Sequence, residues 1–370
     1  RYQQRGGEDQ VVEAETDLLR EQGHAVELLE KDNKSINGIS NLGLAKETIW
    51  SRRSCNDVSE IIGRFRPDVI HAHNTFPLIS PSVFWTAAQH NVPTILTLHN
   101  FRLLCPQAML LRKGGICEDC IGKIPWRGIM HRCYRNSALQ TGVISSMNSF
   151  HRLIGTYKGK INAYIALTNF SRTKFIEGGL PANNIYVKPN FVDIALTDTK
   201  ERSGGLYVGR LSPEKGLHFL TESIKYLNDV RLNIIGTGDM SGELEAHRQF
   251  KLQGWMANSQ VHDTMRSASY LVMPSIWYEG FPVTLIEAFA CGLPVIASRI
   301  GSLAELIKDG ETGLLVEPSS SESLKKAIIW AERHPAEMAE MGIHARKEYE
   351  TKYTSKINYE HLINIYQRIV

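Results

Sequence analysis

The sequence predicts an α/β protein made of two doubly wound domains that face each other across a cleft. The chain has 370 residues, which is too long for one ordinary hydrophobic core and favours two domains. Apolar runs without polar alternation recur along the chain, with helical patterns between them. Such runs are typical of buried parallel strands, and strand–helix repetition is typical of a doubly wound sheet.

In the first half we expect buried strands at 67–73 (PDVIHAH), 92–99 (VPTILTLH) and 162–169 (NAYIALTN). The segment 80–91 is expected to be a helix with Ser80 as its cap and a proline at its first position. No strand precedes the glycine loop RGGED, although a doubly wound domain would have one there. This leads us to expect further chain before Arg1.

The polar, turn-rich segment 188–205 is expected to connect the two domains. A second series of strands follows, at 206–210, 232–236, 250–255, 269–275 and 294–298, with helices in 216–227, 283–292 and 321–334. We therefore place the first domain at 1–190 and the second at 203–353, and expect a C-terminal helix at about 354–370 to pack back on the first. In this architecture ligands bind beyond the carboxyl ends of the strands.

The charge of the chain is unevenly distributed. Its net charge is only +3, but residues 100–175 hold twelve Arg and Lys residues and only two acidic ones. This asymmetry indicates either an anionic partner (phospholipid, a polyphosphate-linked substrate or nucleic acid) or a solvated basic face. Trp126, Ile129 and Met130, interleaved with Arg127 and Arg132, favour a membrane surface over nucleic acid. No apolar run approaches the roughly 18–20 residues that cross a bilayer.

Four of the six cysteines cluster, as Cys105, Cys117, Cys120 and Cys133. One C-x-x-C unit with two distant cysteines is compatible with a structural zinc ion, and equally with reduced thiols packed in the protein. Six cysteines in a chain of this length do not indicate a disulfide scaffold. We expect no catalytic role for this cluster.

The segment YEGFPVTLIEA (278–288) places Glu279 and Glu287 on either side of a helix start near Pro282. The free N–H groups of a first helical turn form an anion site. Nearby carboxylates would repel the anion unless they bind another part of the same ligand, and sugar and ribose hydroxyl groups fit that role. The segment therefore indicates a sugar–diphosphate–ribose ligand. The alternative is a helix-capping glutamate beside an exposed one.

A second feature points to the same ligand. In YVGRLSPEKG (207–216), Arg210 and Lys215 follow a buried strand. Two cations at the carboxyl end of a strand can neutralise a diphosphate, Arg210 through bidentate hydrogen bonds and Lys215 as a point charge. A single Arg or Lys in a loop is usually a surface residue, but two such features in one domain favour a ligand site.

The first domain offers weaker signals. Gly6 and Gly7 allow the backbone to approach a ligand closely. His99 ends a predicted strand and would present its imidazole at the mouth of the crevice. His71 and His73 alternate along a strand, so we expect only one of them to face the crevice and treat both as structural.

Together these motifs resemble those of the retaining glycosyltransferases of family 4, which have two Rossmann-like domains in the GT-B fold. The likeness rests on Arg210 with Lys215, on the E-x7-E spacing of Glu279 and Glu287, and on GFPVTLIEAFACGLPVIAS and GETGLLV. It covers nearly the whole chain, because RGGED, HAHN, TLHN and PNFVD are similar to other signatures of the family. The cysteine cluster resembles an insertion in members that build bacterial polysaccharides.

The resemblance implies a role for each site residue. Arg210 and Lys215 would hold the donor diphosphate, Glu279 the transferred sugar and Glu287 the ribose, while His99 would hydrogen-bond the sugar. Further residues implied to contact the nucleotide-sugar donor are Gly6, Gly7, Gly209, Gly254, Trp255, Gly280, Phe281, Pro282, Thr284 and Leu285.

The implied reaction is transfer of a hexose, with retention, from a UDP- or GDP-sugar to a glycan or lipid-diphosphate-linked acceptor in polysaccharide biosynthesis. Since no DxD-like carboxylate pair is present and Arg210 with Lys215 can replace a divalent metal, we expect no cofactor. We expect a cytoplasmic protein, peripheral at the inner face of the membrane. A nucleotide-sugar 2-epimerase and a catalytically silent sugar-nucleotide-binding subunit are the alternatives.

Overall fold

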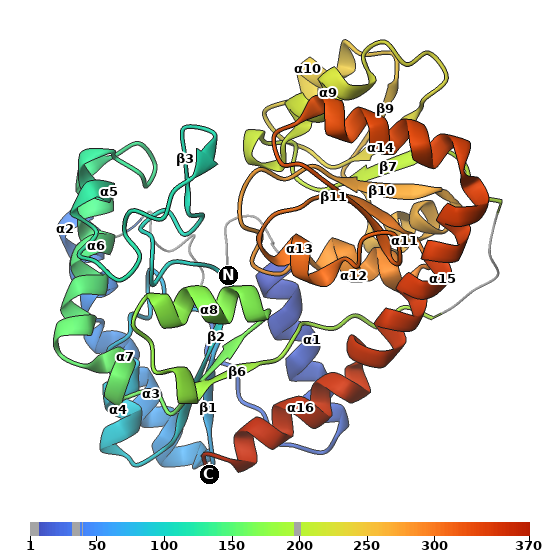
Figure 1. The fold of residues 1–370 in the computed structure, drawn as a ribbon. Helices are drawn as coiled ribbons and strands as arrows, with labels where there is room; N and C mark the ends of the chain where they lie inside the picture. Colours follow the sequence, from blue (N-terminus) through green and yellow to red (C-terminus); the bar gives the residue numbers. More distant parts are fainter. Residues whose placement is uncertain (1–6, 32–37, 39, 196–200) are drawn as a thin grey trace. The chain divides into compact units, whose positions relative to one another are not determined.

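The chain forms two compact units in the computed structural model, which describes residues 7–31, 38, 40–195 and 201–370 (Figure 1). Unit 1 comprises the described residues up to Leu110 together with Cys117–Asn190 and Asn358–Val370. Unit 2 comprises Leu111–Ile116 and Phe191–Ile357. Each unit is an α/β structure built on a parallel sheet, so the expected fold class is confirmed.

Unit 1 contains a four-stranded parallel sheet in the order β1-β2-β5-β6. Its strands are β1 (Ile70–Ala72), β2 (Thr94–Leu98), β5 (Ala163–Ala166) and β6 (Ile185–Val187). Strands β2 and β5 are buried along their whole length, as expected for strands covered on both faces. The three predicted strands are present but shorter, and β6 was not predicted.

Several helices surround this sheet (Figure 1). They are α1 (Gly7–Glu21), α2 (Asn41–Ile49), α3 (Arg52–Phe65), α4 (Val83–Gln89), α5 (Trp126–Met130), α6 (Ala138–Leu153), α7 (Thr156–Gly159), α8 (Asn169–Glu177) and the 3-10 turn η2 (Ala182–Asn184). The prediction that a helix starts at Ser80 was wrong. Ser80 has a φ of +63°, which a helix does not allow, and α4 begins at Val83 with Ser82 at its N-cap.

The last helix, α16 (Ser355–Gln367), belongs to unit 1 from Asn358 onward. Asn358 donates from Nδ2 to the carbonyl of Pro189 at 2.7 Å. Tyr366 Oη lies 2.9 Å from His71 Nδ1 of β1. These contacts connect the end of the chain to the carboxyl end of β6 and to the sheet of unit 1.

Unit 2 contains a six-stranded sheet in the order β12-β11-β10-β7-β8-β9, and every neighbouring pair is parallel. The strands are β7 (Gly205–Val208), β8 (Leu232–Ile235), β9 (Phe250–Gly254), β10 (Tyr270–Met273), β11 (Val295–Ser298) and β12 (Gly313–Val316). The first three strands extend the sheet in one direction and the last three in the other. The order therefore reverses between β7 and β10, which is the point where doubly wound sheets bind ligands.

The other elements of unit 2 connect and cover these strands (Figure 1). They are the 3-10 turn η3 (Pro213–Lys215), α9 (Leu217–Ile224), α10 (Ser241–Glu245), α11 (Asn258–Ser267), α12 (Val283–Ala290), α13 (Gly301–Leu306), α14 (Ser321–Arg333) and α15 (Pro335–Lys352). The short hairpin of β3 (Leu111–Arg112) and β4 (Gly115–Ile116) also belongs to unit 2. None of the described helices is long and apolar enough to span a membrane.

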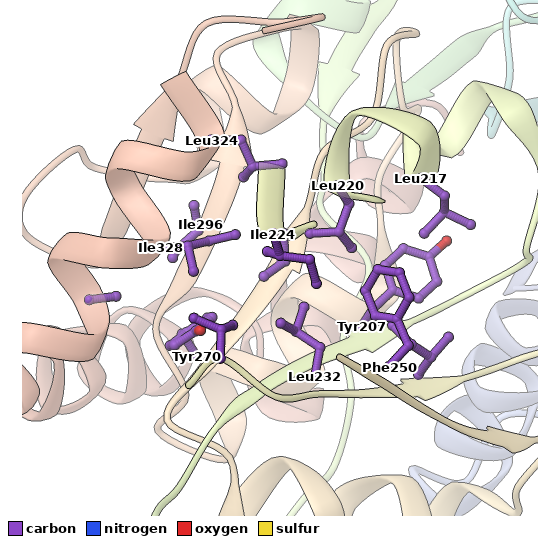
Figure 2. Close-up of a cluster of buried hydrophobic side chains, with 14 of the residues drawn as sticks. Tyr207, Leu217, Leu220, Ile224, Leu232, Phe250, Tyr270, Ile296, Leu324 and Ile328 are labelled. Atoms are coloured by element: carbon purple, nitrogen blue, oxygen red, sulfur yellow. The ribbon is translucent and has the colours of Figure 1, made fainter. Parts of the chain in front are cut away.

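A hydrophobic core lies where α9 and α14 pack on the sheet of unit 2 (Figure 2). Leu217, Leu220 and Ile224 recur at helical spacing along one face of α9, and each is at most 1 % exposed. They meet side chains of the strands, such as Leu232, and Leu324 and Ile328 of α14. This packing fixes α9, and with it the turn that carries Lys215.

We expect Leu220→Ala to destabilise unit 2 by about 2–5 kcal/mol, because it removes a fully buried side chain and leaves a cavity. Urea denaturation followed by tryptophan fluorescence measures this change. Tyr226→Ala is the control, since that side chain is 76 % exposed and its truncation should change stability by less than about 0.5 kcal/mol. Equal midpoints for the two variants would contradict the packing described.

Candidate functional site

Two loops of unit 2 meet where the strand order reverses. One follows β7 and contains Arg210 and Lys215, and the other follows β10 and contains Glu279. The backbone N–H of Ile276 donates to the carbonyl of Glu214 at 3.0 Å, which joins the two loops directly. Neighbouring parallel strands thus place the basic and acidic residues of two distant sequence motifs side by side.

Gly216 allows this close approach. It adopts a φ of +72°, and a Cβ atom there would lie 1.9 Å from the carbonyl oxygen of Pro274. Any other residue would push the loops apart or strain the backbone. The position of Lys215, one residue earlier, depends on this glycine.

Lys215 and Glu279 form an ion pair of 2.7 Å between Nζ and Oε1. Their side chains are only 18 % and 7 % exposed. The same Oε1 accepts hydrogen bonds from Ser275 Oγ at 2.7 Å and from Trp277 Nε1 at 3.1 Å. Three donors on one oxygen fix the carboxylate, while Oε2 has no hydrogen-bond partner among the described residues. Ser275 and Trp277 were not predicted from the sequence.

Arg210 lies in the same loop, but its side chain is 65 % exposed. Its Nη2 atom lies 3.2 Å from Oε1 of Glu214, and Ser212 Oγ donates to that same oxygen at 2.8 Å. Tyr207 Oη donates to the backbone carbonyl of Arg210 at 2.7 Å. The structure thus pairs each of the two cations with a carboxylate, Arg210 with Glu214 and Lys215 with Glu279.

Helix α12 begins at Val283, with Pro282 at its N-cap. No side chain caps this end. The N–H of Leu285 donates to the carbonyl of Pro282 at 3.0 Å and is therefore already satisfied.

Glu287 lies inside the helix, with Oε1 3.4 Å from Nε2 of His262 on α11. His262 was not predicted, because nothing in its sequence context relates it to Glu287. Thr284 lies in the first turn.

The remaining predicted residues of unit 2 surround these loops. The carbonyl of Gly280 accepts a hydrogen bond from Ser302 Oγ at 3.0 Å, and Phe281 is buried against Tyr353. Gly209 directly follows β7, and Gly254 ends β9. Trp255, the next residue, is 78 % exposed and presents a free indole surface at the carboxyl end of that strand.

In unit 1, His99 belongs to a network of mostly buried polar side chains. His73 Nδ1 lies 3.0 Å from His99 Nε2, and His73 Nε2 lies 3.5 Å from Glu15 Oε2. Lys188 forms a buried ion pair with the other oxygen of Glu15 and donates to Asn358 Oδ1 at 3.1 Å. Glu15 and Lys188 were not predicted. Gly7 is the first residue of α1, and Gly6 lies outside the described residues.

The expectation that His71 and His73 point to opposite sides was wrong. Residues two apart in a strand point to the same face of the sheet, so alternation places the two side chains together, and their ring centroids are 4.3 Å apart. The two nitrogens of His71 lie 2.9 Å from Tyr366 Oη and 2.7 Å from Thr97 Oγ1. Both histidines therefore belong to one network.

Burial lowers the pKa of His71, His73 and His99 to about 3 each. Burial is the largest cause of these values, and the ammonium of Lys188 acts in the same direction. Burial alone would raise the pKa of Glu15, but Lys188 and the histidines lower it below its ordinary value. At neutral pH the network therefore contains a carboxylate, an ammonium and three neutral imidazoles.

Glu15, His71 and His73 offer three ligand atoms within 4.8 Å of one another, the one such group found in the described residues. They do not form a convincing metal centre. The Lys188 ammonium already occupies the carboxylate, and both nitrogens of His71 face hydroxyl groups. A divalent ion would have to displace or oppose a fully buried positive charge.

A structural zinc ion at Cys105, Cys117, Cys120 and Cys133, one of the two alternatives that the sequence left open, is not supported. Sulfur atoms that share a tetrahedral zinc lie about 3.8 Å apart. In the part of the chain that the structure describes, no three of these sulfurs lie within 4.8 Å of one another. All four are thiols rather than disulfides, and burial raises the pKa of Cys120 to about 11. The cluster has the features of packed thiols.

The basic segment of unit 1 exposes several large apolar side chains. Trp126 and Met130 of α5 are 53 % and 68 % exposed, and Ile124 and Leu139 are exposed nearby. The Arg127 guanidinium lies 5.6 Å from the centroid of the Trp126 ring. Ile129, predicted to belong to the same surface, is half-buried. We call the exposed set of Lys123, Ile124, Trp126, Arg127, Met130, Arg132 and Leu139 the α5 patch.

Comparison with known proteins gives matches to two family models. The model described as Glycosyltransferase Family 4 matches residues 5–196, and the model described as Glycosyl transferases group 1 matches residues 198–348. Among curated proteins, D-rhamnosyltransferase WbpZ of Pseudomonas aeruginosa is 26 % identical, over 78 % of this chain and 70 % of its own length.

Other matches are more partial or show the fold alone. The uncharacterized glycosyltransferase MJ1178 of Methanocaldococcus jannaschii is 37 % identical, but the match spans only 34 % of this chain and 37 % of that protein. The structure of Anabaena Alr3699/HepE in complex with UDP-glucose superposes with a TM-score of 0.67 and 18 % identity, covering 98 % of this chain and 96 % of that one.

We expect the stability of the protein to fall as the pH is lowered from 6.5 towards 3. In this range the unfolded chain binds protons at His71, His73 and His99, whose pKa values are about 3 in the folded state, so acid favours unfolding. Each histidine contributes up to about 1.4 kcal/mol per pH unit. Urea denaturation at pH 7.5 and pH 5.0 measures the effect. Identical midpoints would show that these histidines do not stay neutral.

Proposed function

Because the chain belongs to the family 4, group 1 glycosyltransferases, we propose that it transfers a hexose from a UDP- or GDP-sugar to a glycan or lipid-linked glycan acceptor, with retention. The observation that carries the proposal is the Lys215–Glu279 pair at the point where the strand order of unit 2 reverses. The HepE structures that contain UDP and UDP-glucose support a uridine nucleotide as the donor base.

The Lys215–Glu279 pair suits a nucleotide-sugar donor because each partner can form further hydrogen bonds. An ammonium has three N–H donors, and Glu279 uses one of them. The others would bind diphosphate oxygens. Glu279 Oε1 is occupied by three donors, so Oε2 would accept a hydrogen bond from a hydroxyl group of the transferred sugar. The lysine thus both binds the phosphate and orients the carboxylate.

Arg210 would complete the phosphate site. Its exposed guanidinium is held by one hydrogen bond to Glu214, and an exposed ion pair of this kind contributes at most about 1 kcal/mol. A doubly charged diphosphate can therefore recruit Arg210 at little cost. The two pairs, Lys215–Glu279 and Arg210–Glu214, together carry no net charge. The attraction for the diphosphate therefore comes from directed hydrogen bonds rather than from a net positive charge.

The other predicted residues would bind the rest of the donor. Glu287, oriented by His262, would accept hydrogen bonds from the ribose hydroxyl groups. The N–H of Thr284, in the first turn of α12, would face a phosphate, and Gly254 with the exposed Trp255 would flank the base. Gly7, at the first position of α1, would leave room for the donor phosphate. The backbone of Gly280, Phe281 and Pro282 would lie along the sugar. Gly209, the first residue of the loop after β7, would also contact the donor.

The proposed reaction is a front-face substitution. The acceptor hydroxyl forms a bond to the anomeric carbon while the bond from that carbon to the diphosphate oxygen breaks on the same face. The departing diphosphate oxygen takes the proton of the acceptor hydroxyl. Lys215 and Arg210 stabilise the charge that develops on the diphosphate. Since two cations fill this role, we propose that the transfer requires no metal ion.

Lys215→Ala and Arg210→Ala are each expected to lower the turnover of sugar transfer by about 10²–10³-fold, because each removes charge stabilisation of the leaving group. Lys225→Ala is the matched control: it removes an exposed lysine of unit 2 that contacts Glu222 and the ring of Tyr226, neither of which belongs to the two loops of the site. Transfer from radiolabelled UDP- and GDP-sugars measures the rates. Folded Lys215 and Arg210 variants with wild-type turnover would rule out the proposed mechanism.

A 2-epimerase would use the same donor without an acceptor. We therefore expect that the wild-type protein, incubated with UDP-sugar alone, forms no epimer detectable by NMR. Addition of a glycan acceptor should release UDP. A new epimer in the absence of acceptor would favour the epimerase, and donor binding without turnover under any condition would favour a silent subunit.

The α5 patch of unit 1 suits an acceptor that is anchored in a membrane. It combines exposed aromatic and aliphatic side chains with exposed cations, and such surfaces insert apolar groups between anionic lipids while the cations bind the headgroups. We propose that unit 1 docks on an anionic membrane surface to reach a lipid-diphosphate-linked acceptor.

We expect the protein to cosediment with vesicles that contain phosphatidylglycerol and not with vesicles of phosphatidylcholine alone, and we expect 0.5 M salt to weaken binding by screening. Trp126→Asp/Met130→Asp should abolish cosedimentation, because it removes the insertion residues of the α5 patch. Tyr226→Asp, at an exposed position of unit 2, should bind like the wild type. Equal binding to both vesicle types would contradict docking by charge.

A further inference from the structure

We propose that Glu15 is a positioning residue: acting through His73, it holds His99 in the tautomer with the proton on Nε2, so that His99 Nδ1 is presented as a hydrogen-bond acceptor to a sugar hydroxyl. The contact with the sugar rests on the proposed glycosyltransferase function. The tautomer rests only on the geometry of unit 1.

The three side chains form a continuous chain of contacts. His73 and His99 follow the neighbouring strands β1 and β2, and their rings stack with centroids 5.2 Å apart and planes inclined by 23°. His73 Nδ1 lies 3.0 Å from His99 Nε2, and His73 Nε2 lies 3.5 Å from Glu15 Oε2. The side chains of Glu15 and His73 are only 3 % and 13 % exposed.

Glu15 determines which ring nitrogen of His73 carries the proton. Its carboxylate is ionised beside Lys188, which lowers its pKa despite burial. An ionised carboxylate only accepts hydrogen bonds. Lys188 occupies Oε1, and Oε2 is buried and accepts no regular hydrogen bond from any residue that the structure describes. His73 Nε2 lies 3.5 Å from this oxygen, and a proton on Nε2 directs an N–H towards the carboxylate, so His73 carries its proton there.

The position of the proton on the His99 ring then follows, because His73 and His99 are both neutral. His73 carries a single proton at working pH, because burial holds its pKa near 3. With Nε2 protonated, His73 Nδ1 is a bare acceptor. The contact of 3.0 Å to His99 is a hydrogen bond only if His99 Nε2 is the donor. His99 is neutral as well, so its Nδ1 keeps a lone pair, and this atom has no hydrogen-bond partner among the described residues.

The tautomer of His99 decides whether this residue accepts or donates the hydrogen bond with the sugar hydroxyl. An Nδ1 acceptor binds a sugar hydroxyl that donates, whereas the other tautomer would present an N–H to the same group. Lys188 contributes by occupying one oxygen of Glu15, so that the other faces His73. His71 lies outside this relay, because both its nitrogens face hydroxyl groups of Tyr366 and Thr97.

The direct test is NMR of the full chain labelled with 15N-histidine. Nitrogen chemical shifts and couplings to the ring protons distinguish the two tautomers, and loss of a signal set in His99→Asn assigns that residue. We expect His99 to be protonated on Nε2 in the wild-type protein at pH 7.5. A proton on Nδ1, or a cationic ring, would overturn the proposal regardless of any result on activity.

Glu15→Gln tests whether Glu15 is the cause. The amide oxygen is expected to take the place of Oε1 beside Lys188, which leaves the amide NH2 to donate to His73 Nε2. His73 must then carry its proton on Nδ1 and donate it to His99, whose own proton moves from Nε2 to Nδ1. Thr97→Val is the matched control, since it removes a buried hydroxyl that contacts His71 only and should leave the tautomer of His99 unchanged.

Activity separates the two parts of the proposal. In a folded Glu15→Gln protein with the switched tautomer, we expect transfer to slow by about tenfold, the effect of one misdirected hydrogen bond, and Thr97→Val to stay at the wild-type rate. A switched tautomer with unchanged transfer would overturn the role of Nδ1 towards the sugar. An unchanged tautomer in Glu15→Gln would overturn the relay itself. If Glu15→Gln does not fold, the tautomer of the wild-type protein still decides.

Discussion

The Lys215–Glu279 ion pair is the interaction around which the candidate site of unit 2 is built. It joins the loop after β7 to the loop after β10, and it exists because these strands are neighbours at the point where the strand order reverses. Gly216, whose backbone lies against Pro274, permits the approach. Side chains of Ser275 and Trp277 then hold the carboxylate in one orientation. The strand order, the backbone of Gly216 and the side chains of Ser275 and Trp277 thus together determine the position of one atom, Glu279 Oε1.

Unit 1 contains the same arrangement of a lysine paired with a buried glutamate, with different neighbouring side chains. In each unit a lysine occupies one oxygen of a buried glutamate and leaves the other directed elsewhere: Glu15 Oε2 towards His73, and Glu279 Oε2 without a partner among the described residues. A buried carboxylate without a counter-ion would be costly. Pairing with lysine stabilises the charge and at the same time orients the remaining lone pairs, which is how a neutral pair can still be selective for a ligand.

The sequence predicted the long buried strands and the motifs that directly follow them, because burial on both faces leaves a clear apolar run and the residues after such a strand lie at one edge of the sheet. It missed β6 and β12, which are only partly buried, although β1 is partly buried as well and was predicted. It also missed His262, Glu15 and Lys188, since these contacts are made by packing between segments that no spacing rule connects. Trp277 lies only two residues before Glu279, but the sequence does not show that its indole N–H points to that carboxylate. The cysteine spacing could not decide between a zinc site and packed thiols for a related reason. Spacing along the chain does not determine distances between sulfur atoms, and among the described residues no three of these sulfurs lie within 4.8 Å of one another.

Calorimetric titration of UDP and UDP-glucose into the wild-type protein, Lys215→Met and Glu279→Gln tests the central claim most directly, because it separates binding of the diphosphate from binding of the sugar. If Lys215 holds the diphosphate and Glu279 the sugar, Lys215→Met weakens both ligands by about tenfold or more. Glu279→Gln would then keep the affinity for UDP and lose the additional affinity for UDP-glucose. A folded Lys215→Met protein that binds UDP as tightly as the wild type would contradict the account.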